Sequence, residues 1–332
     1  MLSHRAPTSA FIGLILRVLA GIVLVLIAYV ALGGAMTAMT GAPTPRGQLY
    51  DIGGRRLHMI CAGPAKTDGP TVLLEAGAFG FSADWGVVQD RLAARGVRSC
   101  AYDRAGLGFS DPGPKPRDGL AVEADLEKLL AAAGEKGPFI LCGHSMAGLR
   151  LRLFAARNPT LVKGVVLVDA TTPEAMENKV MQHFVQTFSN LSRLAAFGAQ
   201  AGLFKPLVYT QYGDKIGLSG PAKAEKRWAF ANGRHNYWAA EEVRDWPLAA
   251  EQARAAGAFS PDLPVAVVTA GAESGGVRAS WKAIQSAPAK ASRQGYVDHV
   301  PGAAHATLLG LDHADAIVRA VEHVRAAALL HA

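Results

Sequence analysis

The sequence has few cysteines and no concentrated charge, and both absences exclude classes of function. The net charge of +7 is spread over 332 residues, without a long Lys/Arg run and without basic residues interleaved with aromatics. Because such patches are the usual mark of nucleic-acid binding, nucleic acid is not expected as a partner. The three cysteines, Cys61, Cys100 and Cys142, lack metal-site spacing, and each lies in an apolar, strand-like run. We interpret them as buried thiols, with a Cys61–Cys100 disulfide as the alternative in an oxidising compartment.

One long stretch of the chain carries no charge. Val18 to Met39 is a run of 22 uncharged residues, longer than the roughly 20 that cross a bilayer and than a signal-peptide core of about 7 to 15. No Ala-x-Ala cleavage site follows it. We therefore interpret residues 1–39 as a retained signal-anchor helix that spans a membrane once, followed by a linker at 40–47. Secretion after cleavage of the segment is the alternative.

The charges that flank this segment bear on its orientation. Arg5 and Arg17 precede the uncharged run, which favours a cytoplasmic N-terminus and a domain on the extracytoplasmic, periplasmic side. Arg46, Arg55 and Arg56 follow the run and weaken that inference. A membrane is thus an expected partner through the N-terminal helix.

Beyond the linker, short apolar runs alternate with segments of helical length. Half of the residues are hydrophobic and 18% are charged, which suffices for one sizeable core. The predicted strands are 48–52, 56–61, 71–75, 97–102, 139–142, 165–169, 264–271 and 296–300, and the predicted helices are 85–95, 120–133, 149–157, 174–197 and 312–329. This alternation predicts an α/β fold with a mostly parallel sheet that is covered on both faces.

A serine stands where one of these strands meets a helix. The apolar run 139–142 leads directly into Gly143-His144-Ser145-Met146-Ala147-Gly148. A strand that turns at once into a helix strains the corner residue and requires small neighbours, as this segment has, although Ala147 replaces the usual second glycine. The corner would hold the Ser145 hydroxyl above the sheet and direct the Met146 N–H, at the start of the helix, toward whatever Ser145 attacks.

Three motifs in order resemble the α/β-hydrolase fold, in its serine-nucleophile, esterase- or lipase-like branch. They are the glycine-rich turn at 76–80, the segment Asp-Arg-x-Gly-x-Gly-x-Ser at 103–110, and the Ser145 corner. The resemblance covers about residues 48–325. It implies an α/β-hydrolase core at 48–169 and 264–332, with the aromatic-rich insertion at 170–263 as a helical cap over the site.

The resemblance also implies the partners of Ser145. His305, in a small-residue turn after the last predicted strand, matches the family's catalytic histidine. For the acid that orients it, two candidates stay open: Asp169, at the end of the strand that follows the Ser145 helix, and Glu273, the only carboxylate between Val265 and Val297. We lean to Asp169. His144 is expected to point away from Ser145, because successive side chains of a strand alternate.

The oxyanion of an acyl-transfer reaction would be bound by two backbone N–H groups. The first is that of Met146, and by position the second is that of Ala78, or of Phe79 if the register shifts by one residue. Family members often carry His-Gly before this donor, whereas here it is Ala76-Gly77, so Glu75 or water would have to stiffen the turn.

These residues imply a serine hydrolase of ester-type acyl bonds that forms a covalent acyl-enzyme and needs no metal or organic cofactor. A serine nucleophile argues against epoxide hydrolase and haloalkane dehalogenase chemistry, which uses an aspartate at this place. Acyl transfer and cofactor-free peroxidation remain open on the same triad. A membrane-tethered, non-catalytic binding protein is the alternative of a different class. The expected substrate is a small acyl compound, and the sequence does not indicate an oligomeric state.

Overall fold

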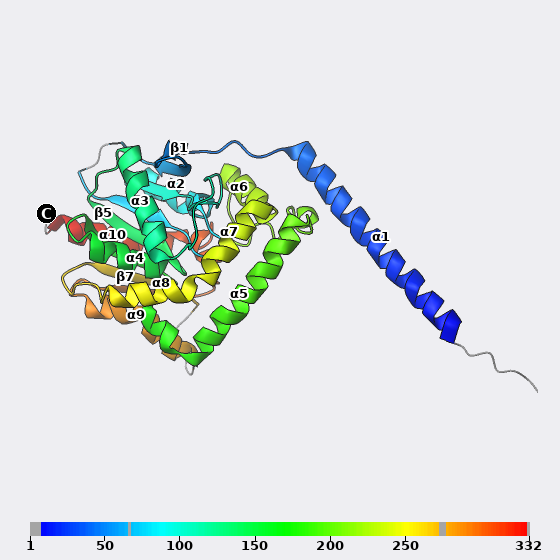
Figure 1. Ribbon diagram of the computed structural model, residues 1–332. Coiled ribbons are helices and arrows are strands. Elements are labelled where there is room, and N and C mark those ends of the chain that lie inside the picture. Colours follow the sequence, from blue (N-terminus) through cyan, green and yellow to red (C-terminus); the bar gives the residue numbers. More distant parts are fainter. Residues whose placement is uncertain (1–7, 66–67, 272–276, 331–332) are drawn as a thin grey trace, which may run out of the picture.

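The computed structural model describes residues 8–65, 68–271 and 277–330. Within these ranges the chain builds one eight-stranded sheet, in the order β1-β2-β4-β3-β5-β6-β7-β8 (Figure 1). The strands are β1 (Gln48–Asp51), β2 (Arg56–Ala62), β3 (Thr71–Glu75), β4 (Ser99–Tyr102), β5 (Phe139–His144), β6 (Val162–Val168), β7 (Val265–Ala270) and β8 (Tyr296–Val300). β2 runs antiparallel to β1 and β4, and the other neighbouring pairs are parallel. The predicted α/β fold with a mostly parallel sheet is confirmed.

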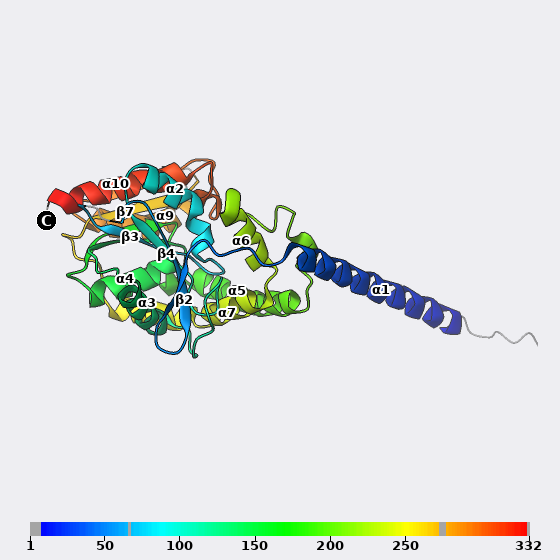
Figure 2. The ribbon, with the colours of Figure 1, turned by 90° about the horizontal axis from the view of Figure 1, so that it is seen from above.

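Helices cover both faces of the sheet. α2 (Gly86–Ala94) and α10 (Ala314–Leu330) pack on one face, and α3 (Gly119–Ala133), α4 (Ala147–Arg157) and α9 (Val277–Ala291) pack on the other. Figure 2 shows α2 and α10 on the opposite side of the sheet from α3 and α4. Successive side chains of one strand pack into different hydrophobic clusters. Val72 and Leu74 lie in the cluster with α2 and α10, and Leu73 lies in the cluster with α3 and α4. Strands buried on both faces explain the continuous apolar runs in the sequence.

A helical insertion separates β6 from β7. It comprises the 3-10 turns η2 (Pro173–Glu177) and η3 (Lys205–Leu207) and the helices α5 (Lys179–Gln200), α6 (Gly220–Phe230), α7 (Gly233–Arg244) and α8 (Trp246–Ala255). α5 packs against α7, α8 packs against α4, and α6 packs against the 3-10 turn η1 (Ser82–Trp85). The insertion therefore packs against the core through α4, which follows β5, and through η1, which follows β3.

The long helix predicted at 174–197 is wrong at its start. The chain first forms η2, and α5 begins only at Lys179. Asn178 separates the two elements with an extended backbone, and its side chain accepts a hydrogen bond from the Val180 N–H, so it caps α5. The amphipathic pattern predicts a helix here but does not indicate that Asn178 caps it from within.

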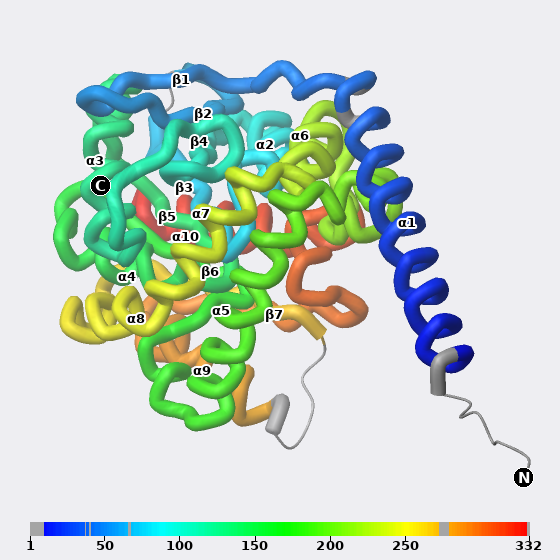
Figure 3. Tube along the Cα trace, turned by 45° about the vertical axis from the view of Figure 1, so that its right-hand side comes forward, coloured from blue at the N-terminus to red at the C-terminus, as the bar shows by residue number. Residues whose placement is uncertain are grey.

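The apolar N-terminal segment forms one helix, α1 (Thr8–Thr40), which projects away from the domain (Figure 1). Within the candidate span Ala10–Met36, an 18-residue window has a mean hydropathy of 2.8, so by length and composition α1 could cross a membrane, as a signal sequence could. Figure 3 shows the chain passing from α1 along the edge of the domain into β1. α1 touches the domain near η3, where a Cβ on Gly33 would lie 2.5 Å from Pro206.

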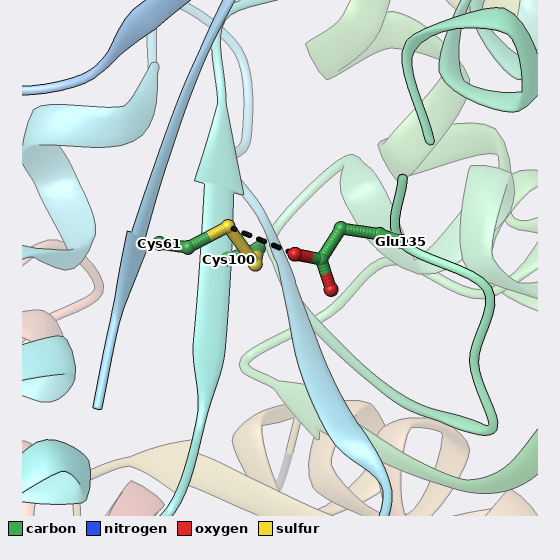
Figure 4. A group of neighbouring side chains, drawn as sticks. All are labelled: Cys61, Cys100 and Glu135. Atoms are coloured by element: carbon green, nitrogen blue, oxygen red, sulfur yellow. Dashed lines mark hydrogen bonds between the residues drawn. A yellow bond between two sulfur atoms is a disulfide. The ribbon is translucent and has the colours of Figure 1, made fainter. Parts of the chain in front are cut away.

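Cys61 and Cys100 form a disulfide, so their interpretation as buried thiols is wrong (Figure 4). The two residues lie directly opposite each other in the antiparallel pair of β2 and β4, where side chains on the same face are close enough to bond. This register could not be read from the spacing of the cysteines. Cys142 is a buried free thiol, as expected.

Candidate active site

Ser145 stands at the corner between β5 and α4 in a strained backbone conformation. Its φ is +58°, a region that residues other than glycine rarely adopt and that is common at functional sites. Its N–H donates to the Val168 carbonyl, and its carbonyl accepts from the N–H groups of Gly148 and Thr171. A Cβ added to Gly77 would lie 2.7 Å from the Ser145 Cβ. The corner is therefore fixed by three hydrogen bonds and lies against the turn after β3.

Asp169 and His305 are joined by a short hydrogen bond. The Nδ1 of His305 lies 2.6 Å from Oδ2 of Asp169, which follows the last residue of β6. The other carboxylate oxygen, Oδ1, accepts a hydrogen bond of 3.1 Å from Nε2 of Gln285 in α9. Because an ionised carboxylate only accepts hydrogen bonds, the proton belongs to Nδ1 of His305, and Nε2 of the neutral ring can take up a proton.

The surroundings keep this carboxylate ionised. Burial acts to raise the pKa of Asp169, but the hydrogen bond and the charge of His305, together with the Gln285 hydrogen bond, hold the pKa below its ordinary value. The side chain of Asp169 is 14% exposed and that of His305 is 52% exposed. A mostly buried, ionised carboxylate is thus paired with a histidine that solvent can reach. The alternative acid, Glu273, lies outside the described residues.

His144 has a role that the sequence did not reveal. Its ring lies 4.4 Å from that of His305 between centroids, and its Nε2 lies 2.9 Å from the His305 carbonyl oxygen. Because a carbonyl only accepts, His144 donates here. Burial, and then the charge of His305, lower the pKa of His144 to about 3. His144 is therefore a neutral donor that holds the backbone of the His305 loop. The two rings meet only in the folded structure, so the sequence does not predict this contact.

The turn after β3 holds the two candidates for the second oxyanion donor, Ala78 and Phe79. Phe79 has a φ of +57°, and Gly80 closes the turn by donating its N–H to the Gly77 carbonyl. The Phe79 carbonyl accepts from Nζ of Lys226 at 3.2 Å and from Nε2 of His235 at 3.3 Å. His235 accepts the Gly108 N–H at its Nδ1, so its proton is on Nε2. Ala78, Phe79 and Met146 border the same apolar cluster.

Two buried arginines hold the carbonyls at the start of this turn. Arg104 donates to the Ala76 carbonyl at 2.7 Å and to the Gly77 carbonyl at 2.9 Å, and it forms an ion pair with Glu242 of α7 at 2.8 Å. Arg150 of α4 also donates to the Ala76 carbonyl, at 3.0 Å. The Arg104 and Glu242 side chains are 1% and 0% exposed. The arginines supply the stiffening that the missing histidine of the His-Gly pattern would give.

Glu75 contributes to this arrangement indirectly. Its carboxylate contacts Nε of Arg150 and accepts a hydrogen bond of 2.9 Å from the Tyr102 hydroxyl. The expectation that Glu75 could stiffen the turn is therefore met through Arg150. The signal for Arg104 was present in the segment at 103–110, but its partner, Glu242, lies 138 residues further along the chain, and no local pattern could identify it.

One group of potential metal ligands exists among the described residues, and it does not suit a metal. Cys61, Cys100 and Glu135 place their donor atoms within 4.8 Å of one another. The two sulfurs are bonded to each other (Figure 4), so neither is available as a thiolate ligand.

Comparison with curated proteins gives partial matches. A probable transporter, efuK, of Hormonema carpetanum is 38% identical over 129 residues, which cover 37% of this chain and 18% of efuK. An uncharacterized protein of Schizosaccharomyces pombe is 25% identical over 315 residues, which cover 86% of this chain and 57% of that protein. The chain thus spans between about a fifth and about three fifths of the length of these relatives.

Solved structures share the fold at low sequence identity. The enol-lactonase from Burkholderia xenovorans LB400 aligns with a TM-score of 0.57 at 18% identity, covering 83% of this chain and 99% of that one. The haloalkane dehalogenase DbeA from Bradyrhizobium elkani USDA94 aligns with a TM-score of 0.63 at 20% identity, covering 86% and 99%. The sequence profile described as alpha/beta hydrolase fold matches residues 70–309. The chain belongs to the alpha/beta hydrolase family.

Proposed function

We propose that the protein is a serine hydrolase that cleaves an ester-type acyl bond, with Ser145 as nucleophile, His305 as base and Asp169 as the acid that orients it. The observation that supports this most directly is the hydrogen bond of 2.6 Å between His305 and Asp169. Ser145, Asp169 and His305 follow β5, β6 and β8, and the ends of parallel strands meet at one edge of a sheet, where such folds carry their sites.

The reaction proceeds in two balanced halves. Nε2 of His305 takes the Ser145 proton while Oγ bonds to the acyl carbon, and the alcohol leaves with that proton as the ester bond breaks. Water then attacks the acyl-enzyme, His305 takes a proton from the water, and the carboxylic acid leaves as Ser145 regains its proton. Asp169 stays ionised throughout and stabilises the imidazolium.

The oxyanion of each tetrahedral intermediate is bound by the N–H groups of Met146 and Ala78, with Phe79 as the alternative. The support is the fixed geometry of both peptides: Met146 is the N-cap residue of α4, and the turn at 76–80 is held by Arg104, Arg150 and the two donors to the Phe79 carbonyl. Donors that are fixed before the reaction are what stabilises a developing negative charge, since no reorganisation is then required.

The nucleophile limits the reaction class more than the fold does. Structures of this shape include both a lactonase and a dehalogenase, so the fold does not choose between acyl and alkyl substrates. A serine gives an acyl ester that water can hydrolyse, which favours an esterase, thioesterase, lactonase or lipase. Acyl transfer to an alcohol and cofactor-free peroxidation would use the same groups with a different second substrate.

We propose further that α1 is a retained membrane anchor and that the domain lies on the extracytoplasmic side, with the insertion at 170–263 acting as a cap over the site. The length and composition of Ala10–Met36 support an anchor. The Cys61–Cys100 disulfide supports an oxidising compartment, and packing of α5 and α8 residues around Met146 supports a cap.

A fluorophosphonate probe, which reacts only with an activated serine, tests the proposed function. The wild-type protein should be labelled, Ser145→Ala should lose all labelling, and Ser219→Ala should keep it. Ser219 is a suitable control because it is exposed and makes no capping hydrogen bond at the start of α6. A folded wild-type protein that stays unlabelled would support the non-catalytic binding protein instead.

A further inference from the structure

The outer side of α5 carries apolar side chains that no other part of the described chain covers. Val180, Phe184, Leu191 and Leu194 are 75%, 51%, 57% and 66% exposed. Their spacing of four, seven and three residues places them on one side of the helix. Single exposed apolar residues are ordinary, but an aligned series along about four helical turns marks an interaction surface.

The C-terminal end of α5 leads into the segment that contacts α1. The chain directly after α5 touches α1, because a Cβ on Gly202 would lie 3.2 Å from Val30 and one on Gly33 would lie 2.5 Å from Pro206. Val30 is six residues, about 9 Å, before Met36, the end of the candidate span. Figure 1 shows α1 leaving the domain from the side along which α5 runs. If α1 crosses a bilayer, the end of α5 is therefore at the level where that bilayer meets water.

The segment that follows α5 has the side chains that favour a lipid–water boundary. Tyr209 and Tyr212 are about half exposed, and the cationic groups of Arg227 and Lys215 lie 5.8 and 5.5 Å from their ring centres. Beside them is a cavity of about 620 Å³ whose lining includes Lys205, Lys223, Arg227 and Gly41 of the linker after α1. Tyrosine and basic residues gather at membrane interfaces, where the ring or stem is buried and the polar end stays wet.

The inner side of α5 packs over the proposed oxyanion site. Met181 and Val185 are buried in the cluster that contains Met146 and borders Ala78. Three aromatic rings connect the two sides of the helix: Phe79 lies 6.1 Å from Phe188, and Phe188 is stacked on the exposed Phe184 at 5.8 Å. Apolar side chains thus run without a break from the oxyanion turn to the outer surface of α5.

We propose that the outer side of α5 and the segment 202–212 lie in the lipid interface beside α1, and that the substrate is a lipophilic long-chain acyl ester dissolved in that bilayer, which reaches Ser145 past Phe184 and Phe188. The substrate part rests on the proposed serine hydrolase function, and the lipid contact rests only on α1 being inserted. A single helix, α5, then separates the membrane from the reacting serine.

The lipid contact is tested in full-length protein reconstituted into vesicles of phosphatidylcholine and phosphatidylglycerol. An environment-sensitive fluorophore is attached to Leu191→Cys or, as a control, to Leu329→Cys. Leu329 is an exposed leucine near the C-terminal end of α10, and Figure 1 shows α10 on the side of the domain opposite α1. Native cysteines should not react, because Cys61 and Cys100 are bonded and burial raises the pKa of the Cys142 thiol.

The fluorophore at position 191 should emit at shorter wavelength in vesicles and lose most of its intensity when spin-labelled phosphatidylcholine is included. The fluorophore at position 329 should show neither change. Equal behaviour at the two positions would overturn the lipid contact, and this readout does not depend on catalysis.

The substrate class is tested with two esters, one short-chain and soluble and one long-chain and dissolved in the vesicles. The double variant Leu191→Glu with Leu194→Glu should hydrolyse the vesicle-borne ester at least about tenfold more slowly than wild type, because it loses the burial of two leucines in the lipid. It should hydrolyse the soluble ester at the wild-type rate. An equal loss on both esters, or no loss on either, would contradict the inference while the serine hydrolase stands. A wild-type protein that cleaves neither ester would refute the proposed function itself, and the fluorescence result would still decide the lipid contact.

Discussion

The two sides of the candidate site are built differently. Ser145, Asp169 and His305 stand at the ends of strands, and the sheet and α9 hold them, with His305 half exposed. The turn at 76–80 is held by charges that are almost completely buried, and one of them, Glu242, belongs to the insertion. The Ser145 side is thus held by the sheet and α9 of the core, whereas the turn side also depends on Glu242 of the insertion.

This difference separates the substitutions expected to slow the reaction from those expected to destabilise the folded protein. A change on the Ser145 side removes a group of the proposed triad and leaves the packing intact, so it should slow the reaction without unfolding the protein. A change on the turn side leaves a charge buried without its partner, which is among the most destabilising substitutions known.

Asp169→Asn should lower kcat by a factor on the order of 10⁴ with little change in stability. An Asn side chain that presents its NH₂ group to His305 forces the ring proton onto Nε2, so the ring can no longer take the Ser145 proton. Steady-state kinetics on a soluble ester measures the effect. Glu273→Gln is the matched control and should stay near wild type; the reverse result would make Glu273 the acid.

Arg104→Met should lower the free energy of unfolding by about 3 to 5 kcal/mol, because Glu242 is left buried without its partner and two turn carbonyls lose a donor. Urea denaturation measures the loss. Arg319→Met is the control: its partner is Asp298, the Arg319 side chain is 55% exposed, and such a pair contributes at most about 1 kcal/mol. Equal losses in the two variants would remove the distinction between the two sides.

The turn side should also be sensitive to acid through His235. Burial, and then the charge of Lys226, lower the pKa of His235 from 6.5 to about 3, so the folded state holds the neutral ring. The stabilisation is complete above pH 6.5 and is lost as the pH falls from 6.5 toward 3, where the unfolded chain binds a proton that the folded chain does not. Between pH 7.5 and pH 5 the loss is about 2 kcal/mol.

Urea denaturation at pH 7.5 and pH 5 measures this contribution. His235→Gln should be less stable than wild type at pH 7.5, because the contacts to Phe79 and Gly108 change, but its stability should fall less between the two pH values. An unchanged pH dependence in the variant would show that His235 does not supply it.

The residues on the Ser145 side of the site could largely be predicted from the sequence. The corner, the His305 turn and the acid at the end of β6 each occupy the end of a strand, and apolar runs with glycine boundaries mark strand ends well. The sequence left Asp169 and Glu273 open because it does not tell which strand end lies beside His305. The hydrogen bond of Asp169 to His305 now favours the first candidate.

The residue pairs that hold the turn side and its surroundings could not be predicted from the sequence in this way. Arg104 and Glu242, His144 and His305, and Cys61 and Cys100 meet through packing and strand register, and hydrophobic periodicity predicts which face is buried but not which residue lies opposite. The contact of α1 with η3 is of the same kind. Predicting such pairs requires the three-dimensional structure, even where the helices and strands are predicted correctly.

The most direct test of the proposed mechanism is the mass of the protein during turnover. Purified enzyme is mixed with an activated ester, quenched in acid within the first turnovers, digested and analysed by mass spectrometry. The account predicts one acyl group on the peptide that contains Ser145, and none in Ser145→Ala. Turnover with no acylated peptide, or with the acyl group on another residue, would contradict it.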